Sequence, residues 1–331
     1  MGVIVGALRS LADRLADWLG ARLWPLAWAT LVANVVLVVT GGAVRLTGSG
    51  LGCPTWPRCT DSSFTPHGSL GVHGAIEFGN RMLTGALVVI AVATFVAAWV
   101  SLRRDVRVLA FLIALGIPAQ IIIGGFTVLS DLNPWVVSFH LLCSLAIIGL
   151  SVVFLHRLSG FGPGPSPGPL RTLAWLAFAA AWVVLYLGTV VTGSGPHAGD
   201  ADAARNGLDP LQVSQLHADF VFLFLGLCVG LYLAVRLAGR STLPLRVLLV
   251  VIVLQGAVGF VQYFTDLPVI LVAFHMLGAA LVSASVTWVL VSVLEPVATG
   301  RAARGSGEPG TASEPGTVPH SPPLGADAGQ R

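Results

Sequence analysis

The sequence predicts an all-α membrane protein with about eight transmembrane helices, arranged as two pseudo-symmetric four-helix bundles. Three observations predict this fold: an apolar composition, a series of long apolar segments and an internal repeat. Of the 331 residues, 55% are hydrophobic and only 10% are charged, which excludes a water-soluble globular domain. The formal net charge is only +3, and we find no basic patch of the kind that binds nucleic acid.

Long apolar segments follow one another along most of the chain. They occupy residues 24–44, 78–100, 106–127, 136–156, 172–192, 215–236, 245–263 and 269–293. Each has roughly the 20 residues that a helix needs to cross the hydrocarbon core of a bilayer. We therefore expect about eight membrane-spanning helices.

The basic residues predict the orientation of these helices. All 18 are arginines, and most lie before the first span, in alternate loops, or after the last span. Only Arg45, Arg58, Arg81 and Arg205 fall in the other loops or at the span ends beside them. Because basic residues concentrate on the cytoplasmic side of a membrane protein, we expect a multi-pass protein of the cell membrane with both termini in the cytoplasm.

Two stretches of equal length are related in sequence. Residues 120–140 read QIIIGGFTVLSDLNPWVVSFH, and residues 255–275 read QGAVGFVQYFTDLPVILVAFH. They share Gln, Gly, Asp, Leu, Val, Phe and a final His at matching positions. An internal repeat in an apolar chain indicates two related helical halves, which we place at residues 22–158 and 171–295.

The segments outside these halves have distinct compositions. Residues 159–170 are rich in Pro and Gly and predict a non-helical cytoplasmic linker. Residues 1–21 place Arg and Asp among Leu and Ala at helical spacing, which is typical of an amphipathic helix on the membrane surface. Residues 296–331 contain almost no large apolar side chain and predict a disordered cytoplasmic tail.

The loops on the outer side carry unusual motifs. The tetrapeptide TGSG occurs at residues 47–50 and again at 192–195, at equivalent points of the two halves. Glycine-rich turns allow close approach of a ligand, but more often they simply end a helix, and we favour the second reading. Cys53 and Cys59 follow in the first of these loops. In an oxidising compartment a disulfide is expected there, with a redox role as the alternative.

Three histidines are placed inside spans. His140 and His275 close the two repeats near the outer ends of the fourth and eighth spans, and His217 lies at the start of the sixth. Ionisable groups at such a depth cost several kcal/mol unless they are paired or bind something. Their recurrence therefore favours ligation over a packing role. We read the histidines at loops, helix ends and the tail as solvated: His67, His156, His197 and His320.

The ligand that best fits two of these histidines is haem. No carboxylate or cysteine lies nearby to complete a tetrahedral zinc site. His217 and His275 supply two imidazoles from two helices, in a pocket expected to be lined by small residues such as Gly259 and Gly278. Two axial nitrogens from facing helices are what a haem in a four-helix bundle requires.

The first half differs at the position that corresponds to His217. His217 precedes the start of its repeat by about as many residues as Asn80 does in the first half. Four polar residues share one face of the second span at helical spacing: Glu77, Asn80, Arg81 and Thr84. The second half therefore has residues suited to holding a haem, and the first half has residues suited to a reactive site.

At these residues the chain resembles the haem A synthase family, membrane enzymes that oxidise a methyl group of haem O to the formyl group of haem A. The resemblance covers about residues 24–293. It rests on RLTGSGLGCPTWPRC at 45–59, IEFGNR at 76–81, and the paired His140 and His275.

The resemblance implies a role for several residues. It implies that His217 and His275 bind a haem b cofactor and that His140 binds the substrate haem. Glu77 would be the carboxylate required for chemistry, and Cys53 with Cys59 would match the family's disulfide cysteines.

The chain departs from the family at one position. The commonest family pattern is Glu-x-x-His-Arg, whereas Asn80 stands here in place of the histidine. Either His140 alone binds the substrate iron or His73 substitutes, and we favour the first, because an open iron position suits O₂ or water chemistry. Arg45 and Arg81 have guanidinium groups suited to haem propionates, or they anchor the chain at the membrane interface.

A second function class predicts a different pattern. A di-haem b-type electron-transfer cytochrome would need histidine pairs in both halves, which Asn80 and Glu77 do not provide. A repeat-built transporter would need polar residues at the midplane, whereas here they gather toward the outer surface. The expected small-molecule partners are haem O and haem A. A haem O synthase, oxidase assembly proteins and a second copy of the chain remain open as protein partners.

Overall fold

The computed structural model describes residues 10, 13–14, 17–101, 103–160 and 166–294. These residues lie in one compact unit. The expected tail at 296–331 and most of the expected amphipathic segment at 1–21 lie outside the described residues.

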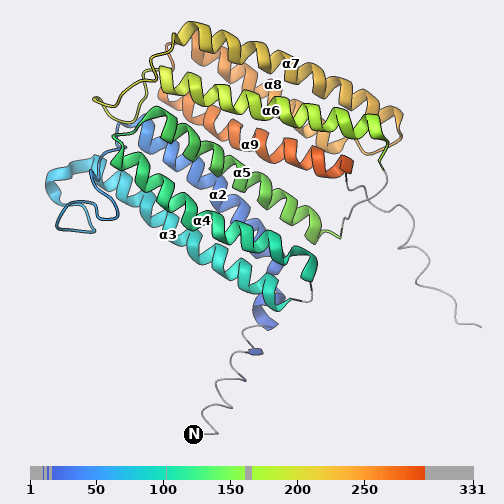
Figure 1. Cartoon of the computed structure of the whole chain (residues 1–331), viewed down its shortest axis with the longest axis horizontal. Helices are drawn as coiled ribbons and strands as arrows, with labels where there is room; N and C mark the ends of the chain where they lie inside the picture. The colour runs from blue at the N-terminus through green and yellow to red at the C-terminus, as the bar shows by residue number, and fades with distance from the viewer. Residues whose placement is uncertain (1–9, 11–12, 15–16, 102, 161–165, 295–331) are drawn as a thin grey trace, which may run out of the picture. The chain divides into compact units, whose positions relative to one another are not determined.

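Long helices dominate the part of the chain that is described (Figure 1). They are α2 (Leu23–Leu46), α3 (Gly71–Val100), α4 (Arg107–Leu129), α5 (Pro134–Leu158), α6 (Gly168–Ser194), α7 (Pro210–Leu237), α8 (Leu243–Phe264) and α9 (Val269–Leu294). Short 3₁₀ turns, Gly68–Leu70 and Arg104–Val106, precede α3 and α4. Eight helical segments are long and apolar enough to cross a membrane, so the expected all-α polytopic membrane fold is confirmed.

Proline and an acceptor side chain define two of the helix starts. The Asn133 side chain accepts a hydrogen bond from the Trp135 backbone N–H before α5, and Asp209 caps α7 in the same manner. Helix α6 already begins at Gly168, so the expectation that residues 159–170 are non-helical is wrong for the last three of them. Pro169 lies in the first turn, where its missing N–H leaves no hydrogen bond unmade.

The helices pack in two rings of four. In the first, α2, α3, α4 and α5 each contact the next and α5 closes onto α2. In the second, α6 to α9 contact in the same cyclic order. Figure 1 shows the first ring in blue to green and the second in yellow-green to orange. Across the boundary, α5 packs on α9, α2 on α9, and α5 on α6.

Small residues bring α5 and α9 close together at this boundary. The Ser283 hydroxyl donates a hydrogen bond to the Leu145 carbonyl over 2.7 Å. A Cβ on Gly149 would lie only 2.9 Å from the Thr287 hydroxyl oxygen. Small and hydroxyl side chains are typical of close helix packing within a membrane.

The sequence repeat is also a repeat of backbone conformation. Asp131 and Leu132 have φ angles of 51° and 57°, and Asp266 and Leu267, at the same repeat positions, have 57° and 55°. In each turn the leucine N–H donates a 2.8 Å hydrogen bond to the carbonyl five residues earlier. Left-handed backbone is uncommon for non-glycine residues, so its recurrence marks the same turn used twice.

Candidate functional site

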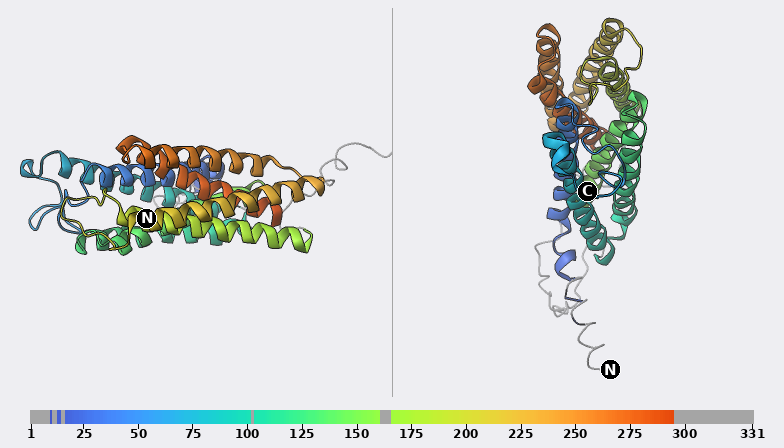
Figure 2. Two further views of the ribbon diagram at one scale, coloured as in Figure 1. Left: turned by 90° about the horizontal axis from the view of Figure 1, so that it is seen from above. Right: turned by 90° about the vertical axis from the view of Figure 1, so that its left-hand side faces the viewer.

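Two loops of the two rings meet at one end of the helices, which we call the disulfide end (Figures 1 and 2). They are the loop between α2 and α3 and the loop between α6 and α7. The Gly50 N–H donates to the Gly199 carbonyl over 2.8 Å. Thr47 and Gly195, from the two TGSG motifs, cap the ends of α2 and α6, which agrees with the helix-ending reading.

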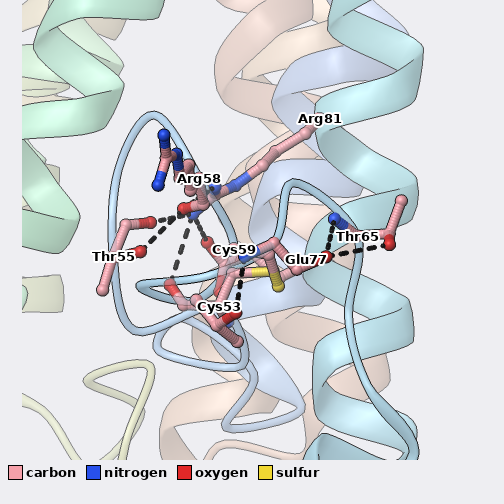
Figure 3. Close-up of a disulfide and its surroundings, with 9 residues drawn as sticks. Cys53, Thr55, Arg58, Cys59, Thr65, Glu77 and Arg81 are labelled. Atoms are coloured by element: carbon pink, nitrogen blue, oxygen red, sulfur yellow. Dashed lines mark hydrogen bonds and ion pairs between the residues drawn. A yellow bond between two sulfur atoms is a disulfide. The ribbon is translucent and has the colours of Figure 1, made fainter.

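A disulfide closes the first loop. Cys53 and Cys59 are bonded at an S–S distance of 2.02 Å, and both are fully buried. Figure 3 shows this bond beside α3, with Glu77 and Arg81 directed toward it. The spacing left a disulfide and a redox role open, and the structure joins the two sulfurs.

Glu77 is buried between α3 and the disulfide loop, with 6% of its surface exposed. Its Oε2 accepts a hydrogen bond from the Cys53 backbone N–H over 2.6 Å. Its Oε1 accepts one from Arg81 over 2.7 Å. Both carboxylate oxygens therefore have a donor, and the loop backbone contributes one of the two.

Arg81 holds the same loop through its backbone carbonyls. Nη2 donates to the carbonyls of Thr55 and Cys53 over 3.0 and 3.3 Å, and Nη1 donates to that of Arg58 over 3.2 Å. The Arg81 guanidinium therefore holds the disulfide loop in place through its backbone. The propionate contact expected for Arg81 stays a prediction.

Trp56 fastens the loop to α4. A Cβ on Gly125 would collide with the Trp56 indole, so glycine is what allows the ring to lie against this helix. Gly124, the preceding residue of α4, faces His140. The disulfide loop therefore covers the end of the first ring beside a candidate ligand, a role for Trp56 that the sequence reasoning missed.

Arg45 ties the end of α2 to the second loop. Its Nε and Nη2 donate to the carbonyls of His197 and Thr192. Burial lowers the pKa of His197, and the positive charges of Arg45 and Arg205 lower it further. The expected propionate contact of Arg45 also stays a prediction.

His73 and Asn80 have local partners. His73 Nδ1 lies 2.9 Å from the Ser49 hydroxyl oxygen, which makes this exposed residue a partner of the TGSG turn. The Asn80 side-chain oxygen accepts a hydrogen bond from the Thr40 hydroxyl over 2.8 Å. The contact of His73 with this turn is consistent with the alternative in which His140 alone binds the substrate iron.

The three histidines inside the spans, His140, His217 and His275, are partly buried, and each faces a glycine of a neighbouring helix. A Cβ built on Gly124 would lie 3.3 Å from Cε1 of His140, one on Gly188 would lie 3.3 Å from Cε1 of His217, and one on Gly259 would lie 3.2 Å from Cε1 of His275. The three glycines let the imidazole edges approach helix backbone. Gly259 was expected in this role, while Gly124 and Gly188 were not.

Gly278 has a different role from the one expected. The Gln255 side chain occupies the space that a Cβ on Gly278 would need. This glycine therefore makes room for an amide, and it does not line the imidazole pocket.

His217 and His275 lie on α7 and α9, at opposite corners of the second ring. The Nδ1 atoms of both are buried, and each imidazole lies near a backbone carbonyl of a neighbouring helix, that of Val184 for His217 and that of Gln255 for His275. Two imidazoles on opposite helices, each against a glycine of a neighbouring helix, fit the ligand set of a haem iron.

The fold and the site define a class: a polytopic helical membrane protein of two four-helix rings, each with partly buried histidine side chains packed against neighbouring helices. Residues 25–70 and 71–201 match the family model of the COX15-CtaA cytochrome oxidase assembly proteins. This match covers more than half of the chain, and the protein belongs to that family.

Several relatives carry one name. The chain is 23% identical over 276 residues to a haem A synthase of Staphylococcus epidermidis (strain ATCC 12228 / FDA PCI 1200), a match that covers 76% of the chain and 90% of the relative. It is 29% identical over 177 residues to the haem A synthase of Exiguobacterium sibiricum, covering 50% and 57%. It is 29% identical over 134 residues to that of Geobacillus thermodenitrificans, covering 40% and 41%.

Proposed function

We propose that the protein is a haem A synthase, which oxidises a methyl group of haem O to the formyl group of haem A for assembly of a terminal oxidase. The family and the names of the relatives support this function. The observation that carries it is the difference between the rings. The second ring contains the pair His217 and His275, whereas the first ring combines His140 with Glu77 and Asn80.

The second ring is the resident cofactor site in this proposal. His217 and His275 would hold haem b from opposite helices, and a bound haem b supplies reversible one-electron chemistry. The glycines that face the two imidazoles, Gly188 and Gly259, let the rings lie directly against the backbone of α6 and α8, which supports a fixed position for both ligands.

The first ring is the substrate site. His140 would bind the iron of haem O, and Asn80, hydrogen-bonded to Thr40, would leave the opposite iron position open. Glu77 would accept or relay protons as the methyl group passes through an alcohol to the aldehyde. Each of its oxygens already accepts one hydrogen bond, and each keeps a second lone pair that can take up a proton.

The proposal includes an orientation. Both termini would lie in the cytoplasm of a cell-membrane protein, and the disulfide end would face the outer, oxidising side, where Cys53–Cys59 is stable. Haem O would enter the first ring laterally, with its propionates directed toward the disulfide end.

Pigment analysis tests the function directly. The protein is expressed with haem O available, the haems are extracted, and their formyl content is measured. A haem A synthase yields a formyl haem that cells without the protein lack. A di-haem electron-transfer cytochrome would return haem O unchanged, and that result would exclude the proposal.

A further inference from the structure

We propose that Gln120 is a positioning residue: when iron binds His140 Nε2, its amide oxygen faces Nδ1–H and fixes the imidazole, and the Gln255 side chain does not do this for His275. The inference rests on the proposed function, in which His140 binds the substrate haem. It assigns different roles to two glutamines that occupy the same position in the two repeats.

In the first ring, the Gln120 side chain reaches the imidazole itself. A terminal atom of its amide lies 2.7 Å from His140 Nδ1, and the hydrogen bonds around the amide favour its nitrogen in this place when Nδ1 is an acceptor. The Ser144 hydroxyl, one turn beyond His140 on α5, lies 3.2 Å from the same amide and donates to the His140 carbonyl over 3.0 Å. Gln120, one turn before Gly124 on α4, and Ser144 on α5 thus contact His140 from two helices.

In the second ring, the side chain of the equivalent glutamine, Gln255, makes its hydrogen bond to the backbone of the histidine and not to its imidazole. Gln255 Nε2 donates to the backbone carbonyl of His275 over 2.7 Å, and among the described residues the Gln255 side chain makes no hydrogen bond to His275 Nδ1.

Two substitutions between the repeats account for this difference. The first repeat has Cys143 and Ser144 where the second has Gly278 and Ala279. Gln255 occupies the space that a side chain at position 278 would fill, and Ala279 offers it no hydroxyl. Cys143 stands at the equivalent position of the first ring, and we infer that its side chain denies Gln120 the same space.

The contact selects between the two neutral forms of His140. If Gln120 presents its nitrogen, Nδ1 accepts the hydrogen bond and the ring proton sits on Nε2. If it presents its oxygen, Nδ1 carries the proton and Nε2 has the free electron pair that iron needs. An acceptor on Nδ1–H also makes the imidazole a stronger electron donor to iron.

Redox titration of the purified full-length holoprotein tests this inference. The first-ring haem is identified as the spectral component that His140→Ala removes. We expect Gln120→Leu to raise its midpoint potential, because the imidazole donates less, and Gln120→Glu to lower it, because a carboxylate is the stronger acceptor. Gln120→Leu should also weaken binding of added iron protoporphyrin IX at this site by about 10- to 100-fold.

Opposite shifts of the midpoint potential in Gln120→Leu and Gln120→Glu distinguish a positioning role from a packing role. Loss of a packing contact alone would shift the potential of both variants in the same direction. Gln255→Leu is the matched control and should leave the first-ring potential unchanged. The double variant G278C/A279S gives the second ring the neighbours of Gln120, and we expect it to lower the potential of the second-ring haem.

Failure of the proposed function and failure of the inference about Gln120 give different results. If His140→Ala removes no haem component, the iron ligand assigned in the proposed function is wrong and this inference falls with it. If that component is lost but Gln120→Leu and Gln120→Glu do not shift the potential in opposite directions, only the role of Gln120 is overturned.

Discussion

The backbone N–H of Cys53 donates a 2.6 Å hydrogen bond to Glu77 Oε2, so the carboxylate proposed for proton transfer is fastened to the disulfide loop. Arg81 binds Glu77 and three loop carbonyls at the same time. The position of the acid and the closure of the loop therefore depend on each other.

Replacing Glu77 with Gln tests its chemical role. Gln keeps the shape but cannot take up a proton, so we expect formyl-haem production to fall by about 100-fold or more. The low-spin haem b spectrum should remain, because His217 and His275 are in the other ring. Formyl haem is measured by extraction from membranes with equal amounts of each protein, and unchanged yield would refute the assignment.

Replacing Arg81 with Ala should loosen the disulfide loop. The change removes donors from three carbonyls and leaves buried Glu77 without its ion-pair partner, a loss of about 2–4 kcal/mol by analogy with other buried charged hydrogen bonds. We expect faster hydrogen exchange at residues 53–59 and a lower Tm. Arg58→Ala is the control, since that exposed guanidinium contacts, within the described part of the chain, the Asp61 carbonyl and the Phe64 ring; an equal effect of both variants would argue against this role.

Replacing His275 with Ala should abolish the low-spin bis-histidine spectrum, and His217→Ala should do the same, because each supplies one axial nitrogen. The measurement is the absorption and electron paramagnetic resonance spectrum of the purified protein. His73→Ala is the control and should retain the full signal, since His73 contacts Ser49. A complete low-spin signal in His275→Ala would remove the cofactor site from the second ring.

Replacing Gly259 with Ala places a methyl group about 3.2 Å from the His275 ring, tighter than ordinary contact, so the imidazole must move. We expect haem b content after purification to fall several-fold. Gly256→Ala, one turn earlier on α8, meets nothing within 4 Å and carries the same gain in helix propensity. Equal haem content in the two variants would show that the glycine does not set the position of the ligand.

The stability of the disulfide end should depend on pH through His197. Because burial, Arg45 and Arg205 lower its folded-state pKa, the unfolded chain binds more protons as the pH falls through about 6.5. Folding is therefore weakened on acidification and is unaffected well above that pH. We expect His197→Asn to reduce the fall in Tm between about pH 8 and pH 5.5; an identical fall in both proteins would contradict this.

The sequence predicted the eight spans, the repeat and the candidate ligands because apolar length and recurrence are local properties. It could not predict that Arg45 and Arg81 bind loop carbonyls, because nothing in an arginine's own neighbourhood identifies a partner more than 20 residues away. His156, expected to be solvated, is buried at the end of α5, since helix ends pack in ways that periodicity does not reveal.

The two repeat glutamines recur in the sequence, but they make different contacts in the structure. Gln120 and Gln255 open the two related stretches, and their recurrence was visible in the sequence. Their different contacts follow from the residue at one repeat position of the facing helix, which is Cys143 in the first ring and Gly278 in the second. Only the packed structure shows which space each glutamine can enter.

The contacts between the rings have an evolutionary consequence. Equivalent helices α5 and α9 meet each other, and the α2–α9 contact is matched by the α6–α5 contact. This is the isologous arrangement of a symmetric dimer, in which each surface meets its own copy. We infer that a four-helix ancestor once associated with itself in this way, and that gene fusion then freed one copy to lose a ligand and gain chemistry.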